Sequence, residues 1–309
     1  MKLNIYVVLS VWAMLSCVWS VQEAQASSMM WAASAEQEAD LTDLQTLQAL
    51  AEEGKAEAQT KLGLVYFRTN DISQNQKEAA KWFRLAADQD QAEAQYYLGT
   101  LYEHGQGVTK SGEEAVKWYS LAADQGSSLA QFNLAAMYYK GLGVRQDYAE
   151  AAKWYRLAAE QGDPMAQDNL GGMYARGNGV KQNSKKAVKW IKLAADQGYA
   201  LSQFNLGVIY GSGRGVRQND KKAAKWFKLA ADQGNAFAQF NLAVMYRDGL
   251  GVKRHNKMAL MWFNLSALSG IDGAVYNRDL LAKTMTSSQI TKAKAMAVNW
   301  MAAYMAKKK

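Results

Sequence analysis

The sequence predicts an all-α solenoid whose 36-residue unit is a pair of helices. Tryptophans recur every 36 residues through six copies, at Trp82, Trp118, Trp154, Trp190, Trp226 and Trp262. Glutamine, leucine and tyrosine keep the same period through six copies, beginning at Gln59, Leu62 and Tyr66. One fixed period shared by several residue types is the signature of a repeat architecture. Pro164 is the only proline, so the helices are expected to be uninterrupted.

The third copy shows the predicted helix pair. Ala130 and Leu134 lie on one face of a first helix. Residues 141–144, Gly-Leu-Gly-Val, end it, because glycine adopts positive φ readily. A second helix carries Trp154 and closes at Gly162. We expect the tryptophans to pack between helices, since each unit of a solenoid buries its faces against its neighbours.

The repeated glutamine is a polar residue on a largely buried face of the first helix. An unpaired buried amide would cost about 1–3 kcal/mol. We therefore expect each of these amides to hydrogen-bond the backbone of the turn between helices.

The ends of the array are predicted to be capped. Residues 41–54 are expected to form a capping helix, residues 55–270 six repeats, and residues 271–309 closing helices with a basic tail. Thr286 and Gln289 have the spacing of a capping box that begins the closing helix.

The first 26 residues are predicted to be a signal peptide. Lys2 precedes an uncharged, mostly apolar stretch over residues 5–21, and residues 24–26, Ala-Gln-Ala, offer a cleavage site. Residues 27–40 lack the repeat pattern and are expected to be a flexible leader. We expect cleavage and a periplasmic or secreted protein. A membrane anchor through residues 5–21 and lipid attachment at Cys17, the only cysteine, remain alternatives.

Three segments of the third copy carry a resemblance to a known family. They are residues 130–134 (Ala-Gln-Phe-Asn-Leu), 141–144 and 151–155 (Ala-Ala-Lys-Trp-Tyr). Over about residues 41–306 the chain resembles the Sel-one-like repeat proteins, relatives of the tetratricopeptide repeats. The resemblance implies a right-handed superhelix of antiparallel helix pairs that acts as an adaptor or scaffold. A cysteine-rich branch of that family is linked to β-lactam binding, and this chain departs from it because its repeats contain no cysteine.

Neither catalysis nor a cofactor is predicted. His104 and His255 are interpreted as surface turn residues, and neither has a second histidine or a cysteine at metal-ligand spacing. The chain has a net charge of +8, but acidic residues interrupt the basic residues along the second helices. This pattern disfavours nucleic acid as a partner. We expect a monomer without an enzyme activity, without a metal and without membrane insertion after signal cleavage.

The candidate partner-binding residues lie on the first helices, which line the concave groove in tetratricopeptide relatives. They are Asn133, Asn169, Asn205 and Asn241, with Phe132, Phe204 and Phe240. By that resemblance, the asparagines would hold the backbone of an extended peptide and the phenylalanines would offer apolar pockets. Asparagines that only brace neighbouring helices are the alternative. Lys61 and Tyr97 interrupt the row, so the groove is expected in copies three to six.

The sequence thus predicts an exported adaptor that binds a partner protein or an extended peptide. An envelope enzyme acting on peptidoglycan or β-lactams is the alternative, and charge-driven attachment to a membrane or polysaccharide is a third.

Overall fold

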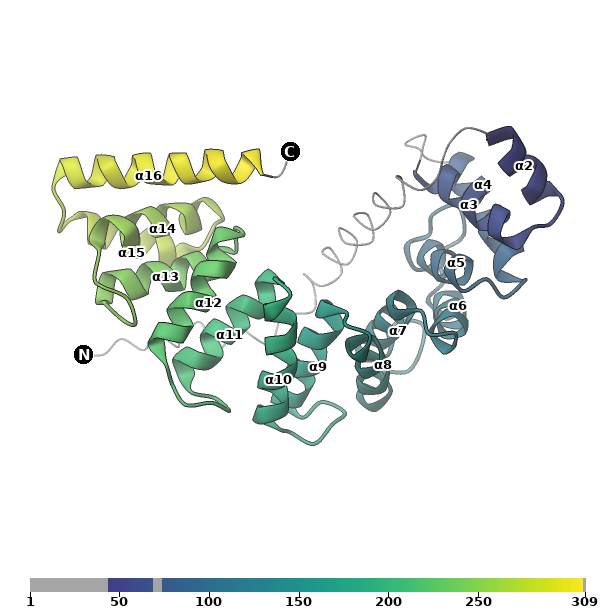
Figure 1. Cartoon of the computed structure of the whole chain (residues 1–309), viewed down its shortest axis with the longest axis horizontal. Helices are drawn as coiled ribbons and strands as arrows, with labels where there is room; N and C mark the ends of the chain where they lie inside the picture. The colour runs from purple at the N-terminus through teal and green to yellow at the C-terminus, as the bar shows by residue number, and fades with distance from the viewer. Residues whose placement is uncertain (1–43, 69–73, 308–309) are drawn as a thin grey trace. The chain divides into compact units, whose positions relative to one another are not determined.

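A computed structural model of the chain describes residues 44–68 and 74–307, which fall into two compact units. The N-terminal unit comprises residues 44–181 and the C-terminal unit residues 182–307. All regular secondary structure in these ranges is helical, as predicted (Figure 1). The predicted signal peptide, the leader, Cys17 and the turn of the first copy lie outside the described residues.

The N-terminal unit has eight helices among its described residues. They are α2 (Leu44–Glu52), α3 (Ala56–Arg68), α4 (Gln74–Ala87), α5 (Ala92–His104), α6 (Gly112–Asp124), α7 (Ser128–Lys140), α8 (Tyr148–Glu160) and α9 (Pro164–Arg176). Within this unit, the first helices α3, α5 and α7 each pack on the second helix that follows them, and the second helices α4, α6 and α8 each pack on the first helix of the next copy. Helix α2 lies within residues 41–54, the range of the predicted N-terminal capping helix, and ends at Glu52.

The C-terminal unit has seven helices among its described residues. They are α10 (Ser184–Asp196), α11 (Ala200–Ser212), α12 (Asp220–Asp232), α13 (Ala236–Asp248), α14 (Asn256–Leu268), α15 (Asp272–Ala282) and α16 (Ser287–Ala306). The predicted capping box of Thr286 and Gln289 is confirmed at the start of α16, which packs along α14 (Figure 1). Among the helices of the described ranges, none combines the length and the apolar character needed to cross a membrane.

Polar side chains fix where the second helices begin. Asp147 precedes α8, and its carboxylate accepts hydrogen bonds from the backbone N–H groups of Ala149 and Glu150. His255 holds the same position before α14, where Nδ1 accepts from the backbone N–H of Met258 at 3.2 Å. The interpretation of His255 as an ordinary turn residue is therefore incomplete, because its ring caps a helix by satisfying one of the free N–H groups.

The two glycines of the repeat turn are required for different reasons. Gly141 ends α7 in the left-handed conformation, with φ of +70°. Gly143 also has positive φ, +69°, and a Cβ atom there would lie 2.0 Å from the carbonyl carbon of Gly112. The first glycine thus reverses the chain, and the second lets the turn touch the start of α6 in the preceding copy.

The buried glutamines form the hydrogen bonds predicted for them. Gln131 donates from Nε2 to the carbonyl oxygen of Ala123, at 3.1 Å, in the last turn of the preceding helix. Its Oε1 accepts from Gln161 Nε2 at 2.8 Å, and Gln161 also donates to the carbonyl oxygen of Gly126 at 3.0 Å. The same arrangement links Gln59 to Gln89. A polar residue in the core therefore ties each copy to the next while leaving its own amide satisfied.

Candidate functional site

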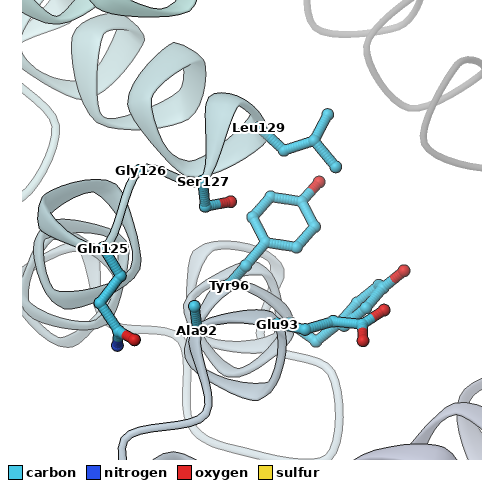
Figure 2. Close-up of a pocket in the computed structure, with 8 residues that line it drawn as sticks. Ala92, Glu93, Tyr96, Gln125, Gly126, Ser127 and Leu129 are labelled. Carbon is cyan, nitrogen blue, oxygen red and sulfur yellow. The ribbon is translucent and has the colours of Figure 1, made fainter.

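A pocket of about 360 Å³ lies between the second and third copies of the N-terminal unit. Its lining residues come from the start of α5 and from the turn that leads into α7, and they are Ala92, Glu93, Tyr96, Tyr97, Gln125, Gly126, Ser127 and Leu129. Figure 2 shows Glu93 and Tyr96 on one helix, with Ser127 and Leu129 on the neighbouring segment. We call this cavity the Tyr96 pocket. Leu129 belongs to the third copy and the other lining residues belong to the second, so the pocket lies where these two copies meet.

Local structure explains how the lining residues meet. Glu93 and Tyr97 are four residues apart on α5, so they lie on one face of that helix. On the other wall, Gly126 has φ of +90°, and this reverses the chain directly after α6. Ser127 follows as the N-cap of α7, and its Oγ accepts from the backbone N–H of Ala130. The pocket therefore lies at a helix start, beside a turn whose conformation is fixed.

Aromatic rings form one side of the pocket. The ring of Tyr97 stacks on that of Phe83, with centroids 5.2 Å apart and planes 13° apart. Tyr96 lies edge-on to Tyr97 at 5.1 Å and packs on Tyr119 at 6.0 Å. These contacts hold the two tyrosines in place before any ligand arrives, which lowers the entropy that binding must overcome.

A buried polar network supports the aromatic wall. The hydroxyl of Tyr119 donates to Glu103 Oε2 at 2.7 Å and lies 3.2 Å from Thr100 Oγ1. The side chains of Thr100 and Asn133 lie near the hydroxyl of Tyr96 and act to lower its pKa. Burial is the main cause that raises the pKa of both tyrosines, so both stay protonated at neutral pH.

Glu93 is the charged residue of the pocket. It makes no ion pair within 4 Å with another described residue, although the positive charges of Arg68 and Lys61 act on it from farther away. Glu93 is exposed to solvent, but the surrounding protein removes part of its hydration and raises the pKa of the carboxyl group. A carboxylate with incomplete hydration favours a cation or a hydrogen-bond donor as its partner.

The asparagines of the predicted row lie on four first helices, with differing exposure. In the N-terminal unit, Asn133 on α7 and Asn169 on α9 are half-buried, and Asn133 lies near the hydroxyl of Tyr96 as described above. In the C-terminal unit, Asn205 on α11 and Asn241 on α13 are only 9% and 6% exposed. Asn241 donates to the carbonyl oxygen of Phe237, four residues earlier, at 2.8 Å. Asn133 thus adjoins a pocket, while the amide of Asn241 is engaged by its own helix.

The three phenylalanines of the prediction pack on the second helix of their own copy. Phe132 lies 5.6 Å from Tyr155 and is 4% exposed. Phe204 packs on Phe227 at 5.9 Å and is 7% exposed, and Phe240 is half-buried. Little of these rings is available to form pockets for a partner in this conformation.

The tryptophans of the repeat differ in how far they are buried. Trp82, Trp118, Trp154 and Trp262 are buried, whereas Trp190 and Trp226 are half-buried. Lysine side chains lie over several of these rings, for example Lys153 over Trp154 at 5.2 Å. In the last copy, α16 takes over this covering role, and Trp300 packs edge-on against Trp262 at 5.7 Å.

Among the described residues, no group of three or more histidine, cysteine or acidic side chains is placed to hold a metal ion. His104, half-buried at the end of α5, contacts the carbonyl oxygen of Thr100 through Nδ1 at 2.9 Å.

A second cavity, of about 450 Å³, lies at the turn of the fifth copy beside Tyr210, Arg217 and Lys222. There Lys222 already lies 5.0 Å from the centre of the Tyr210 ring.

Sequence reasoning placed the groove in copies three to six and missed the Tyr96 pocket. The available signal was Tyr97 itself, which was interpreted as an interruption of the asparagine row. Laid over the first copy, Tyr97 stands at the phase of Lys61, four residues after a glutamate in both copies.

A family model described as the Sel1 repeat matches the chain in six consecutive segments. They are residues 56–91, 92–127, 128–163, 164–199, 200–235 and 236–271. No curated protein matches the chain. The repeat boundaries in this match fall at the starts of the first helices, in agreement with the 36-residue period.

Two solved structures are similar to this chain at 36% sequence identity. The first is c5321 of uropathogenic Escherichia coli, described as a protective antigen with an SLR fold, with a TM-score of 0.77 over 86% of this chain. The chain spans 56% of the length of that antigen. The second is a Sel1 repeat protein from Oxalobacter formigenes, with a TM-score of 0.63 over 70% of this chain and 89% of its own.

Proposed function

Because the chain belongs to the Sel1 repeat family, whose members generally serve as protein-interaction scaffolds, we propose that it is an exported adaptor. In this proposal it binds an extended segment of a partner protein along the first helices of its repeats. The observation that carries the proposal is the Tyr96 pocket, which lies at the border of the second copy and includes Leu129 of the third. A groove that crosses copies is suited to an extended chain, because successive side chains of the segment can enter successive copies.

The balance between core and surface supports binding on the first helices. The repeated glutamines, tryptophans and turn glycines are used in stacking the copies, through the hydrogen bonds and close contacts described above. In the N-terminal unit, Asn133 and Asn169 are half-buried on first helices and keep partial access to solvent. Asparagine amides carry a donor and an acceptor, so they can pair with the backbone of a peptide of any sequence.

Export is proposed from the sequence of the first 26 residues. A cleaved signal followed by a cysteine-free mature chain is compatible with an oxidising compartment, where a free thiol would be open to oxidation or disulfide formation. N-terminal sequencing of the protein recovered from its native cells tests this part. A new N-terminus near Ser27 is expected, and an intact Met1 would contradict export by cleavage.

Partner binding is tested by in-cell crosslinking followed by mass spectrometry. Alanine substituted together at Asn133, Asn169, Asn205 and Asn241 is expected to reduce the yield of crosslinked partner without loss of helical circular dichroism. As a matched control, alanine at Lys117 and Lys153 changes exposed residues of second helices and should leave the yield unchanged. Normal yield with the asparagine variant would contradict binding through that row.

A further inference from the structure

Two successive copies have a glutamate at the same repeat position but differ in the residue that follows it by four positions. In the first copy, Glu57 pairs with Lys61, four residues later on α3, at 2.8 Å. In the second copy, the equivalent residues are Glu93 and Tyr97 on α5. The lysine that neutralises the carboxylate in one copy is thus replaced by an aromatic ring in the next.

The exchange leaves Glu93 without an ion-pair partner on its own helix. Glu93 lines the pocket and has no ion-pair partner within 4 Å among the described residues, and Tyr97 lines it one helical turn away. Arg68 and Lys61 lower the pKa of Glu93 by their charge, but desolvation outweighs them and the net shift is upward. Neither of these cations lies within 4 Å of this exposed carboxylate as an ion-pair partner.

We propose that the Tyr96 pocket binds a basic side chain, arginine or lysine, of the partner segment, between the carboxylate of Glu93 and the ring of Tyr97. This rests on the proposed function and names the side-chain chemistry that the site selects. The incoming cation takes the role that Lys61 has one copy earlier.

The other lining groups suit the same ligand. A guanidinium or ammonium group has several N–H donors, and the lining residues include Ser127, whose Oγ accepts one hydrogen bond from Ala130 and has a second lone pair. The aliphatic stem of arginine or lysine is apolar, and Leu129 gives it an apolar contact.

The aromatic contact has precedents within this chain. Lys81 lies 5.0 Å from the centre of the Trp82 ring, and Lys222 lies 5.0 Å from the centre of the Tyr210 ring. Cations are attracted to aromatic faces at this range, and the attraction grows when the site is partly desolvated. Tyr97 has one face stacked on Phe83, so its ring is already fixed for such a contact.

The test uses capped arginine, acetyl-arginine-amide, against capped citrulline, its neutral analogue, followed by amide chemical shifts of residues 92–97 and 125–129. We expect capped arginine to produce saturable shifts with a dissociation constant in the millimolar range, and citrulline to produce none. Glu93→Gln should weaken arginine binding by at least about tenfold, because the charge that selects the ligand is gone. Glu57→Gln is the matched control at the same repeat phase and should bind arginine as the native protein does.

Tyr97→Lys provides the reverse test. It recreates the glutamate–lysine pair of the first copy, so the introduced lysine should fill the site and abolish arginine binding. Thermal unfolding of each variant reports whether it is folded. If Tyr97→Lys is not folded, arginine binding by Glu93→Gln alone tests the inference.

Three results would overturn the inference. They are equal shifts with citrulline, unchanged binding in Glu93→Gln, or binding seen only in Arg68→Ala, which would mean that Arg68 itself occupies the site. The capped amino acid probes the pocket without a partner. If capped arginine does not bind but a partner is captured in cells, the cation site is wrong and the adaptor proposal is not affected. If capped arginine binds but no partner is captured, the cation site is supported and the adaptor proposal is wrong.

Discussion

The second glycine of the repeat turn makes a contact between copies that a pair of alanine substitutions can isolate. Gly143 and Gly126 both have positive φ, at +69° and +90°. A Cβ atom at Gly126 would meet nothing within 4 Å. At Gly143 it would lie 2.0 Å from the carbonyl carbon of Gly112 and 2.5 Å from the backbone nitrogen of Glu113. Alanine at either site would therefore have the same kind of backbone strain, but only at Gly143 would its Cβ atom collide with the backbone of the preceding copy.

The expected costs follow from these two terms. Holding alanine in the left-handed region costs about 1–2 kcal/mol, and this applies to both variants. Forcing an extra methyl group into a filled space adds about 1–3 kcal/mol at Gly143, because backbone atoms have to move. We expect Gly126→Ala to lower the free energy of unfolding by about 1–2 kcal/mol and Gly143→Ala by about 2–5 kcal/mol.

Urea unfolding followed by far-ultraviolet circular dichroism measures both variants. Stability in repeat proteins depends on nearest-neighbour interfaces, so Gly143→Ala should also broaden the transition by uncoupling adjacent copies. Equal midpoints and equal widths for the two variants would refute the reasoning, because they would show that the turn does not contribute to stacking.

Three further substitutions test the interior of the repeats. Gln131→Leu removes two buried hydrogen bonds and should cost about 1–3 kcal/mol in urea unfolding, whereas a cost near zero would mean that the glutamine link does not stabilise the stack. Tyr119→Phe removes the hydroxyl that donates to Glu103 and should cost about 1–3 kcal/mol, with the helical content unchanged; greater stability would contradict the network. Burial raises the pKa of Asp163, the N-cap of α9, so its ionisation in the folded state opposes stability as pH rises through the unfolded and then the folded pKa. Asp163→Asn keeps a cap of the kind that Asn235 provides for α13, and it should raise the melting temperature at pH 7 but not at pH 3; no difference between the two pH values would contradict the burial effect.

The repeat period predicted most of the fold because each copy repeats the same local instructions. Gly141 and Gly143 marked the turn, and the phase of Gln131 indicated a buried amide that needs partners. What remained outside the prediction was the cap formed by His255. Its phase is shared with Asp147, whose residue type is a common helix cap, and an imidazole is a rarer choice for the same hydrogen bond.

The candidate site was harder to predict because it depends on exceptions to the period. Averaging over copies emphasises Asn133 and its equivalents and treats Tyr97 as noise, although Tyr97 lines the pocket. The sequence also could not give the burial of Phe132, since which face of α7 meets α8 depends on how closely the helices approach. In this protein, the repeat positions that keep the same residue in every copy indicate stacking. Positions at which one copy carries a different residue indicate where a site can be.

Site-specific photo-crosslinking tests whether an extended segment of a partner protein binds along the first helices at the Tyr96 pocket. A photoreactive amino acid replaces Leu129 in the Tyr96 pocket, and a control replaces Lys117 on the exposed side of α6. We expect the Leu129 position to capture an extended segment of one partner protein, with a basic residue beside the attachment point, and the Lys117 position to capture none. Capture of that partner equally from both positions, or from Lys117 alone, would contradict binding along the first helices.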